Sequence, residues 1–194
     1  MTETTRYTTV AIVLHWVIGI LLIGMVFYGW YMEDLGHALR DGTGNVSLAE
    51  VQFAYNAHKT AGMLVLLLSF GRLAWRLMHK TPGMPAGMKP WEQTVATATH
   101  WAFYGLMIGL PLVGWVAAST SELPTMLFNN PDLILPRLPV SQEHGFHELV
   151  GNIHGKGAWV LLILVGLHFA AAIKHQFIDK DGLWNIFAVA HAAG

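Results

Sequence analysis

The segment HGKGAWVLLILVGLH, residues 154–168, decides the fold class of this 194-residue chain. It opens an apolar stretch from about His154 to Phe177, in which the block Ala158–Ile173 contains no Asp, Glu, Lys or Arg. A membrane-spanning helix needs about 20 consecutive, mostly apolar residues. The length and composition of this stretch therefore predict a helix that crosses a membrane.

Three further stretches meet the same criterion, at about residues 10–30, 55–77 and 94–118. Pro111 in the third is tolerable because neighbouring helices can satisfy the backbone groups that a proline frees. The first stretch is too long for a signal-peptide core and no small-residue cleavage site follows it, so we expect it to be retained. The sequence thus predicts an all-α integral membrane four-helix bundle, a single domain over residues 1–194 with its fourth span at about 154–177.

The composition supports a membrane protein and excludes several other classes. Hydrophobic residues make up 54% of the chain and charged residues 12%, about half the usual charged share, and the mean hydropathy is +0.44. The chain has no cysteine, which excludes disulfides, thiolate zinc sites, iron–sulfur clusters and covalently attached haem. A net charge of −1 gives no reason to expect nucleic acid as a partner. The chain does contain 11 histidines.

Loop charges predict the orientation, because basic residues gather in cytoplasmic loops. The side that holds both ends of the chain has seven bases: Arg6, Arg72, Arg76, Lys80, Lys89, Lys174 and Lys180. Its acids are Glu3, Glu92, Asp179 and Asp181. The opposite side has four bases, Arg40, Lys59, Arg137 and Lys156, and eight acids: Glu33, Asp34, Asp41, Glu50, Glu122, Asp132, Glu143 and Glu148. We therefore expect both termini to be cytoplasmic. The connections 31–54 and 119–153 then face outward, the second as an irregular, proline-rich cap.

Histidines within the spans are functional candidates, since ionisable side chains are costly in a membrane. His154 and His168 are 14 residues apart, which is about 21 Å along a helix and within roughly 40° of the same face. Two imidazoles so placed suit two stacked haems rather than one metal ion. His15 lies at the depth of His168, and His58 at the depth of His154. The pattern predicts two axial ligand pairs, His15 with His168 and His58 with His154.

A second pattern concerns the residue four positions after each of these histidines, which is small every time. These residues are Gly19, Gly62, Ala158 and Ala172. Positions i and i+4 are neighbours on a helix face, so a small residue there leaves room for a porphyrin ring. Small residues are also common wherever membrane helices pack together, and that alternative stays open.

Arg72 lies 14 residues after His58, on the same face and at the depth of the cytoplasmic haem. It could pair with a haem propionate, or it could simply follow the positive-inside bias, as Arg76 could. His100 opens the third span with the bulky Tyr104 one turn later. It could contact a quinone or carry a proton, or it could be an imidazole at the headgroup level.

The other six histidines are expected near the haems, in loops or in the tail. They are His37, His79, His144, His147, His175 and His191.

Four ordered motifs resemble the bacterial cytochrome b-561 family over all four spans. They are His15-Trp16, Arg72-Leu-Ala-Trp-Arg76, Leu110-Pro-Leu-Val-Gly114, and Gly166-Leu-His168 followed by Ala-Ala-Ala and His175. The resemblance implies a four-helix protein of the bacterial inner membrane with two haem b groups. Its axial ligands fall on the four histidines that the spacing selects.

The resemblance also implies an oxidoreductase, most simply a superoxide oxidase that takes electrons from superoxide at the outer face and reduces ubiquinone. Lys59 and Lys156, next to two of the expected ligands, could attract the anion together with Arg137. They could equally pair with propionates or with the surplus acids of the outer side.

Two other functions remain open. Relatives serve as haem-b membrane subunits that pass electrons between the quinone pool and a periplasmic redox partner, and the large outer connections suit such a role. A haem-free metal-ion transporter would also use histidines, but its ligands would cluster near the midplane rather than pair at two depths.

Overall fold

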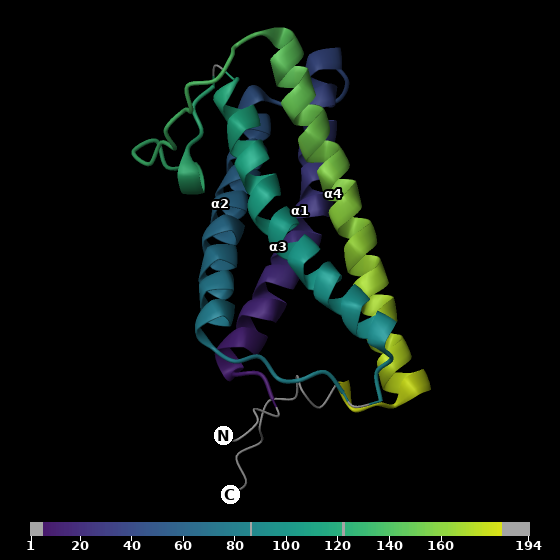
Figure 1. Ribbon diagram of the computed structural model, residues 1–194. Helices are drawn as coiled ribbons and strands as arrows, with labels where there is room; N and C mark the ends of the chain where they lie inside the picture. The colour runs from purple at the N-terminus through teal and green to yellow at the C-terminus, as the bar shows by residue number, and fades with distance from the viewer. Residues whose placement is uncertain (1–5, 86, 122, 184–194) are drawn as a thin grey trace, which may run out of the picture.

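The computed structural model describes residues 6–85, 87–121 and 123–183, which form four long antiparallel helices (Figure 1). The helices are α1 (Thr9–Asp41), α2 (Leu48–Met78), α3 (Pro90–Ser119) and α4 (His144–Ile173). A π-helical turn, η2 (Lys174–Asp179), continues α4, and a 3₁₀ turn, η1 (Leu127–Asn129), lies between α3 and α4. All four helices, with η2 counted as part of the fourth, are long and apolar enough to cross a membrane. The all-α prediction with four spans is confirmed.

The bundle has two distinct ends, which we name by residues. The Thr9 end holds the starts of α1 and α3, the end of α2 and the turn η2. The Gly42 end holds the turn at 42–47 between α1 and α2, together with the connection at 120–143 (Figure 1). Which end faces the cytoplasm stays a prediction from the loop charges. Two of the charged residues used for it, Glu3 and Glu122, lie outside the described residues. His191, expected in the tail, lies outside them as well.

Helices α1 and α2 extend beyond the expected spans at the Gly42 end, so most of the expected connection 31–54 is helical. Helix α1 ends where Gly42 takes a left-handed conformation, φ 64°, and Thr43 N–H donates to the Ala38 carbonyl. Helix α2 begins with a capping box, in which Ser47 and Glu50 satisfy each other's backbone N–H groups. Capping, rather than hydropathy, sets these ends. Helix α4 likewise begins at His144, ahead of the expected span.

The apolar core lies at mid-height, between the two depths at which the histidines were expected to pair. It consists of side chains from all four helices: Ile18, Leu22, Val65, Tyr104, Met107 and Leu161. Consecutive helices pack against each other along the bundle, and α4 closes it by contacting α1. An aromatic contact between Trp30 and Trp159, with ring centres 4.9 Å apart, joins α1 to α4 towards the Gly42 end.

The connection 120–143 folds back over the side of α2 as the irregular cap that the sequence predicts. Met126 N–H donates to Asn56 Oδ1 at 3.1 Å, and Phe128 N–H donates to Thr60 Oγ1 at 2.9 Å. Lys59 Nζ donates to Thr125 Oγ1 at 3.1 Å. The buried polar residues of α2 near His58 are therefore partners for this cap.

Candidate functional site

The structure brings the four candidate histidines together in the two pairs expected from their depth. At the Thr9 end the ring centres of His15 and His168 are 6.1 Å apart. At the Gly42 end those of His58 and His154 are also 6.1 Å apart. In each pair the rings come from different helices and lie edge to face, with angles between their planes of 64° and 81°.

This separation fits one metal ion between two imidazoles. Bonds from a metal to an imidazole nitrogen are about 2 Å long, so the ring centres of two imidazoles on opposite sides of one ion lie about 6 Å apart. Rings whose centres are 6.1 Å apart are too far apart for a direct hydrogen bond, and His15, His168, His58 and His154 would be the residues that hold a metal ion between them. The four histidines therefore fit haem iron, although ligation itself stays a prediction.

The His154 ring is held closely against α3. Its Nδ1 lies 3.1 Å from the Leu110 carbonyl oxygen. Gly114 permits this approach, because a Cβ atom at that position would lie 3.0 Å from His154 Cε1. Gly157, three residues after His154, makes room for the Leu110 side chain in the same way. Sequence reasoning gave neither glycine a role.

The His58 ring is buried against Gly29 of α1, where a Cβ atom would lie 3.4 Å from His58 Cε1. Its Nδ1 is buried and has no hydrogen-bond partner among the described residues. Buried polar atoms are nearly always paired, so an orphaned imidazole nitrogen is itself a sign of a binding site.

Arg72 contacts a candidate ligand directly, which the sequence did not predict. Its Nη1 donates to His15 Nδ1 at 3.1 Å. The guanidinium also lies 6.0 Å from the centre of the Tyr104 ring, and that of Arg76 lies 5.7 Å from the same ring. The arginine is thus at the depth of the His15/His168 pair, as expected.

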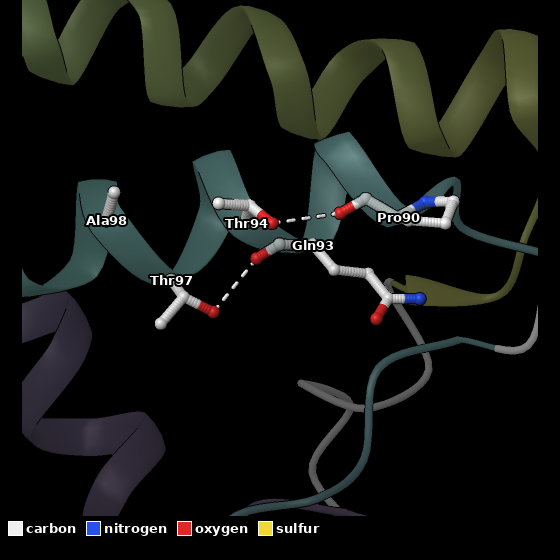
Figure 2. Close-up of a pocket in the computed structure, with 5 residues that line it drawn as sticks. All are labelled: Pro90, Gln93, Thr94, Thr97 and Ala98. Carbon is white, nitrogen blue, oxygen red and sulfur yellow. Dashed lines mark hydrogen bonds between the residues drawn. The ribbon is translucent and has the colours of Figure 1, made fainter.

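His100 joins the pair at the Thr9 end, with its ring centre 5.9 Å from that of His168. An open groove of about 620 Å³ runs along α3 just before it, lined by Pro90, Gln93, Thr94, Thr97 and Ala98 (Figure 2). The hydroxyls of Thr94 and Thr97 donate to backbone carbonyls four residues back, and Gln93 Nε2 donates to the Met88 carbonyl. His100 lies on the same helix, two residues after Ala98 at the end of this groove.

The two lysines expected to surround the outer haem lie in different settings. Lys59 is partly buried under the cap, bound to Thr125 and close enough to Arg137 for the two charges to interact. Lys156 is exposed, two residues after His154 and so about 200° round α4 from it. The structure brings Lys59 together with Arg137 and not with Lys156.

Several histidines expected to be loop residues are part of helices. His37 lies in α1 beside Arg40, and His144 and His147 lie in the first turns of α4. His147 bonds to Thr120 at 2.6 Å. The helical extensions described above account for these differences.

His175 is buried at the Thr9 end and belongs to a polar cluster that sequence reasoning missed. Its Nδ1 lies 2.6 Å from an oxygen of Asp181 and 3.2 Å from one of Asp179. Lys174 binds Asp179 and also Glu92 of α3. The cluster ties the end of α4 to the start of α3.

Comparison with known proteins supplies the family. A family model described as prokaryotic cytochrome b561 matches residues 6–188. The chain is 27% identical to "Cytochrome b561 homolog 2" of Escherichia coli K12, covering 91% of this chain and 87% of that protein. It is 24% identical to "Probable superoxide oxidase CybB" of Yersinia pestis, with 91% and 92% covered, and 26% identical to "Cytochrome b562" of Cereibacter sphaeroides, with 94% and 95% covered. The chain therefore belongs to the prokaryotic cytochrome b561 family of haem-b-binding, multi-pass bacterial membrane proteins that transfer electrons.

Proposed function

We propose that the chain binds two haem b groups and transfers electrons from superoxide at the Gly42 end to ubiquinone at the Thr9 end. The observation that carries this proposal is the pairing of four histidines at two depths, with each pair 6.1 Å apart. Haem with two imidazole ligands supplies a one-electron couple with no free axial position, which favours electron transfer over oxygen activation.

The chain holds the two pairs apart and keeps water from the space between them. The ligands contributed by α4 are separated by about 21 Å along its axis. The apolar core fills the bundle at mid-height between them. This core also weighs against a metal-ion transporter, whose path would need polar groups where Ile18 and Val65 are buried.

The overall reaction oxidises two superoxide ions for each ubiquinone that is reduced. Two superoxide ions each lose one electron and leave as O₂. Ubiquinone accepts these two electrons together with two protons and becomes ubiquinol. The name of the Yersinia pestis relative supports superoxide as the donor.

At the Gly42 end, the cationic pair Lys59 and Arg137 would draw an anion towards the His58/His154 pair. Lys59 is fixed by Thr125 beneath the cap, so its charge is held near His58. Lys156, being exposed, adds only to the general field of this end.

At the Thr9 end, we place the quinone in the groove before His100. The groove lies along the first turns of α3, and the hydroxyls of Thr94 and Thr97 are already bonded to backbone carbonyls (Figure 2). His100 would then donate to a quinone carbonyl from a ring that contacts His168.

A second function, a membrane subunit for a periplasmic redox protein, is favoured by one observation. Helices α1 and α2 extend past the expected spans at the Gly42 end and carry four exposed acids: Glu33, Asp34, Asp41 and Glu50. Such a projecting acidic hairpin could dock a basic protein and would repel superoxide at long range.

Stopped-flow mixing of the purified, haem-loaded protein with superoxide separates the two functions. The proposal predicts rapid haem reduction that slows with added salt. Lys59→Gln should slow it about threefold through loss of one steering charge, Lys156→Gln should slow it less, and Lys80→Gln at the other end should have no effect. No haem reduction by superoxide would exclude the oxidase function and favour the redox-subunit function. A rate that is indifferent to salt and to Lys59→Gln would exclude the steering role.

A further inference from the structure

The two histidine pairs differ in where their ring protons lie. At the Gly42 end, the Leu110 carbonyl oxygen lies 3.1 Å from His154 Nδ1. A carbonyl oxygen only accepts, so Nδ1 carries the ring proton and Nε2 keeps its lone pair. Histidines that bind metals usually donate their second ring nitrogen to such an oxygen. His154 is therefore already in the tautomer that binds iron through Nε2.

The opposite holds for His15 at the Thr9 end. Arg72 Nη1 lies 3.1 Å from His15 Nδ1, and a guanidinium has donors only. His15 Nδ1 must accept, so the ring is neutral and its single proton is on Nε2. The nitrogen left for iron therefore has no lone pair to offer while Arg72 stays in place.

We propose that Arg72 is a latch on the His15/His168 site, so that haem enters this site only after the guanidinium leaves His15 Nδ1, and the His58/His154 site fills first. The latch rests on the proposed function, because it presumes that both pairs bind haem. Its chemistry is a shift of one proton within His15, from Nε2 to Nδ1, with no change in charge or electron count.

An arriving haem offers Arg72 a better partner than His15. Each propionate is an anion with two acceptor oxygens, so it can pair with the guanidinium through two parallel N–H bonds, whereas His15 Nδ1 is a single neutral acceptor. The guanidinium lies 6.0 Å from the centre of the Tyr104 ring and within hydrogen-bond distance of His15, so it is already next to the His15/His168 pair. Only a ligand that interacts differently with the two positions of Arg72 can shift it, and a propionate does so.

The alternative is that His15 loses its Nε2 proton altogether. Arg72 would then stay in place and bind an imidazolate. Neutral imidazole gives up its last proton only in strong base, so the shift within the ring needs less free energy at neutral pH.

The direct test uses full-length protein with one working site. His154→Ala removes a ligand from the Gly42 end, and His58→Ala serves the same purpose should the first variant not fold. Haem-free protein in detergent is mixed with ferric haem b, and growth of the haem absorption band is followed. Arg72→Met in this background should bind haem about tenfold faster, the factor expected when a hydrogen bond to a charged group no longer has to break. Arg76→Met, which removes a neighbouring arginine that stacks on Trp101 and Tyr104, is the matched control and should leave the rate unchanged.

The direction of the change distinguishes the latch from a simple propionate partner. Removing a cation that only binds propionate would slow the capture of an anionic haem. A rate for Arg72→Met equal to or below that of its parent would therefore overturn the latch. Absence of haem binding in both this background and the unchanged protein would overturn the proposed function as well, so the two failures can be told apart.

A spectroscopic measurement on the fully loaded, otherwise unchanged protein tests the same point independently. Near-infrared magnetic circular dichroism distinguishes ferric haem with two neutral imidazoles from haem with an imidazolate ligand. The latch predicts neutral imidazole at both sites. An imidazolate signature at one haem that disappears in Arg72→Met would show that the Arg72 guanidinium stays on His15 Nδ1 when haem is bound. That result would contradict the latch.

Discussion

At the scale of single residues, the site at the Gly42 end depends on two glycines, Gly114 and Gly157, because any side chain there would meet a neighbour. Gly114 lets His154 approach α3 until its Nδ1 meets the Leu110 carbonyl, and Gly157 admits the Leu110 side chain. These contacts fix both the position and the tautomer of His154. Glycine here serves close approach and not backbone freedom, since neither position has a positive φ.

Gly114→Ala should therefore disturb one haem and not the other. The added Cβ would lie 3.0 Å from His154 Cε1, so the ring must move by a few tenths of an ångström and its bond to Leu110 must lengthen. We expect an altered electron paramagnetic resonance signal and a changed midpoint potential for the haem at His58/His154.

Gly109→Ala on the same helix is the matched control, because nothing lies within 4 Å of a Cβ atom there. The haem at His15/His168 should be unchanged in both variants. Equal spectra for Gly114→Ala and Gly109→Ala would show that contact with α3 does not position His154.

At the scale of elements, hydropathy predicts the membrane-crossing part of each helix but not its ends. The apolar stretches at 10–30 and 55–77 lie inside α1 and α2, whose ends depend on Gly42 and on the Ser47 capping box. Both signals are local and readable in the sequence. The packing of η1 on α2 is not, because it joins Asn56 and Thr60 to backbone groups about 70 residues away.

The candidate site, too, has features that the sequence predicts and contacts between distant segments that it does not. The histidine pairs could be predicted because helix periodicity and the depth of each span together fix which side chains meet. The partners of Nδ1 could not, because they depend on how each helix is rotated against its neighbour. Leu110 meets His154 and Arg72 meets His15 through contacts between helices, for which a single span carries no signal.

At the scale of the whole molecule, the two ends differ in shape and charge. The Gly42 end has helical extensions, a folded cap and most of the acids, and the Thr9 end has most of the bases. The direction of electron flow across the membrane depends on which end faces the cytoplasm.

The absence of cysteine makes this orientation easy to test. Asn45→Cys places one thiol in the turn at the Gly42 end, and Lys80→Cys places one after α2 at the Thr9 end, both at exposed positions. A maleimide that cannot cross the inner membrane should label Asn45→Cys and not Lys80→Cys in cells with a permeabilised outer membrane. Disruption of the inner membrane should then expose Lys80→Cys. The reverse pattern would invert the proposed direction of electron transfer.

The central claim, two haems each held by one histidine pair, is tested most directly by counting haem per chain. We expect two haem b per chain in the unchanged protein, one in His154→Ala and one in His168→Ala, with a different haem lost in each. His144→Ala, an exposed histidine of α4 paired with Glu148, should keep both. A single haem in the unchanged protein, or loss of the same haem in both ligand variants, would contradict the account.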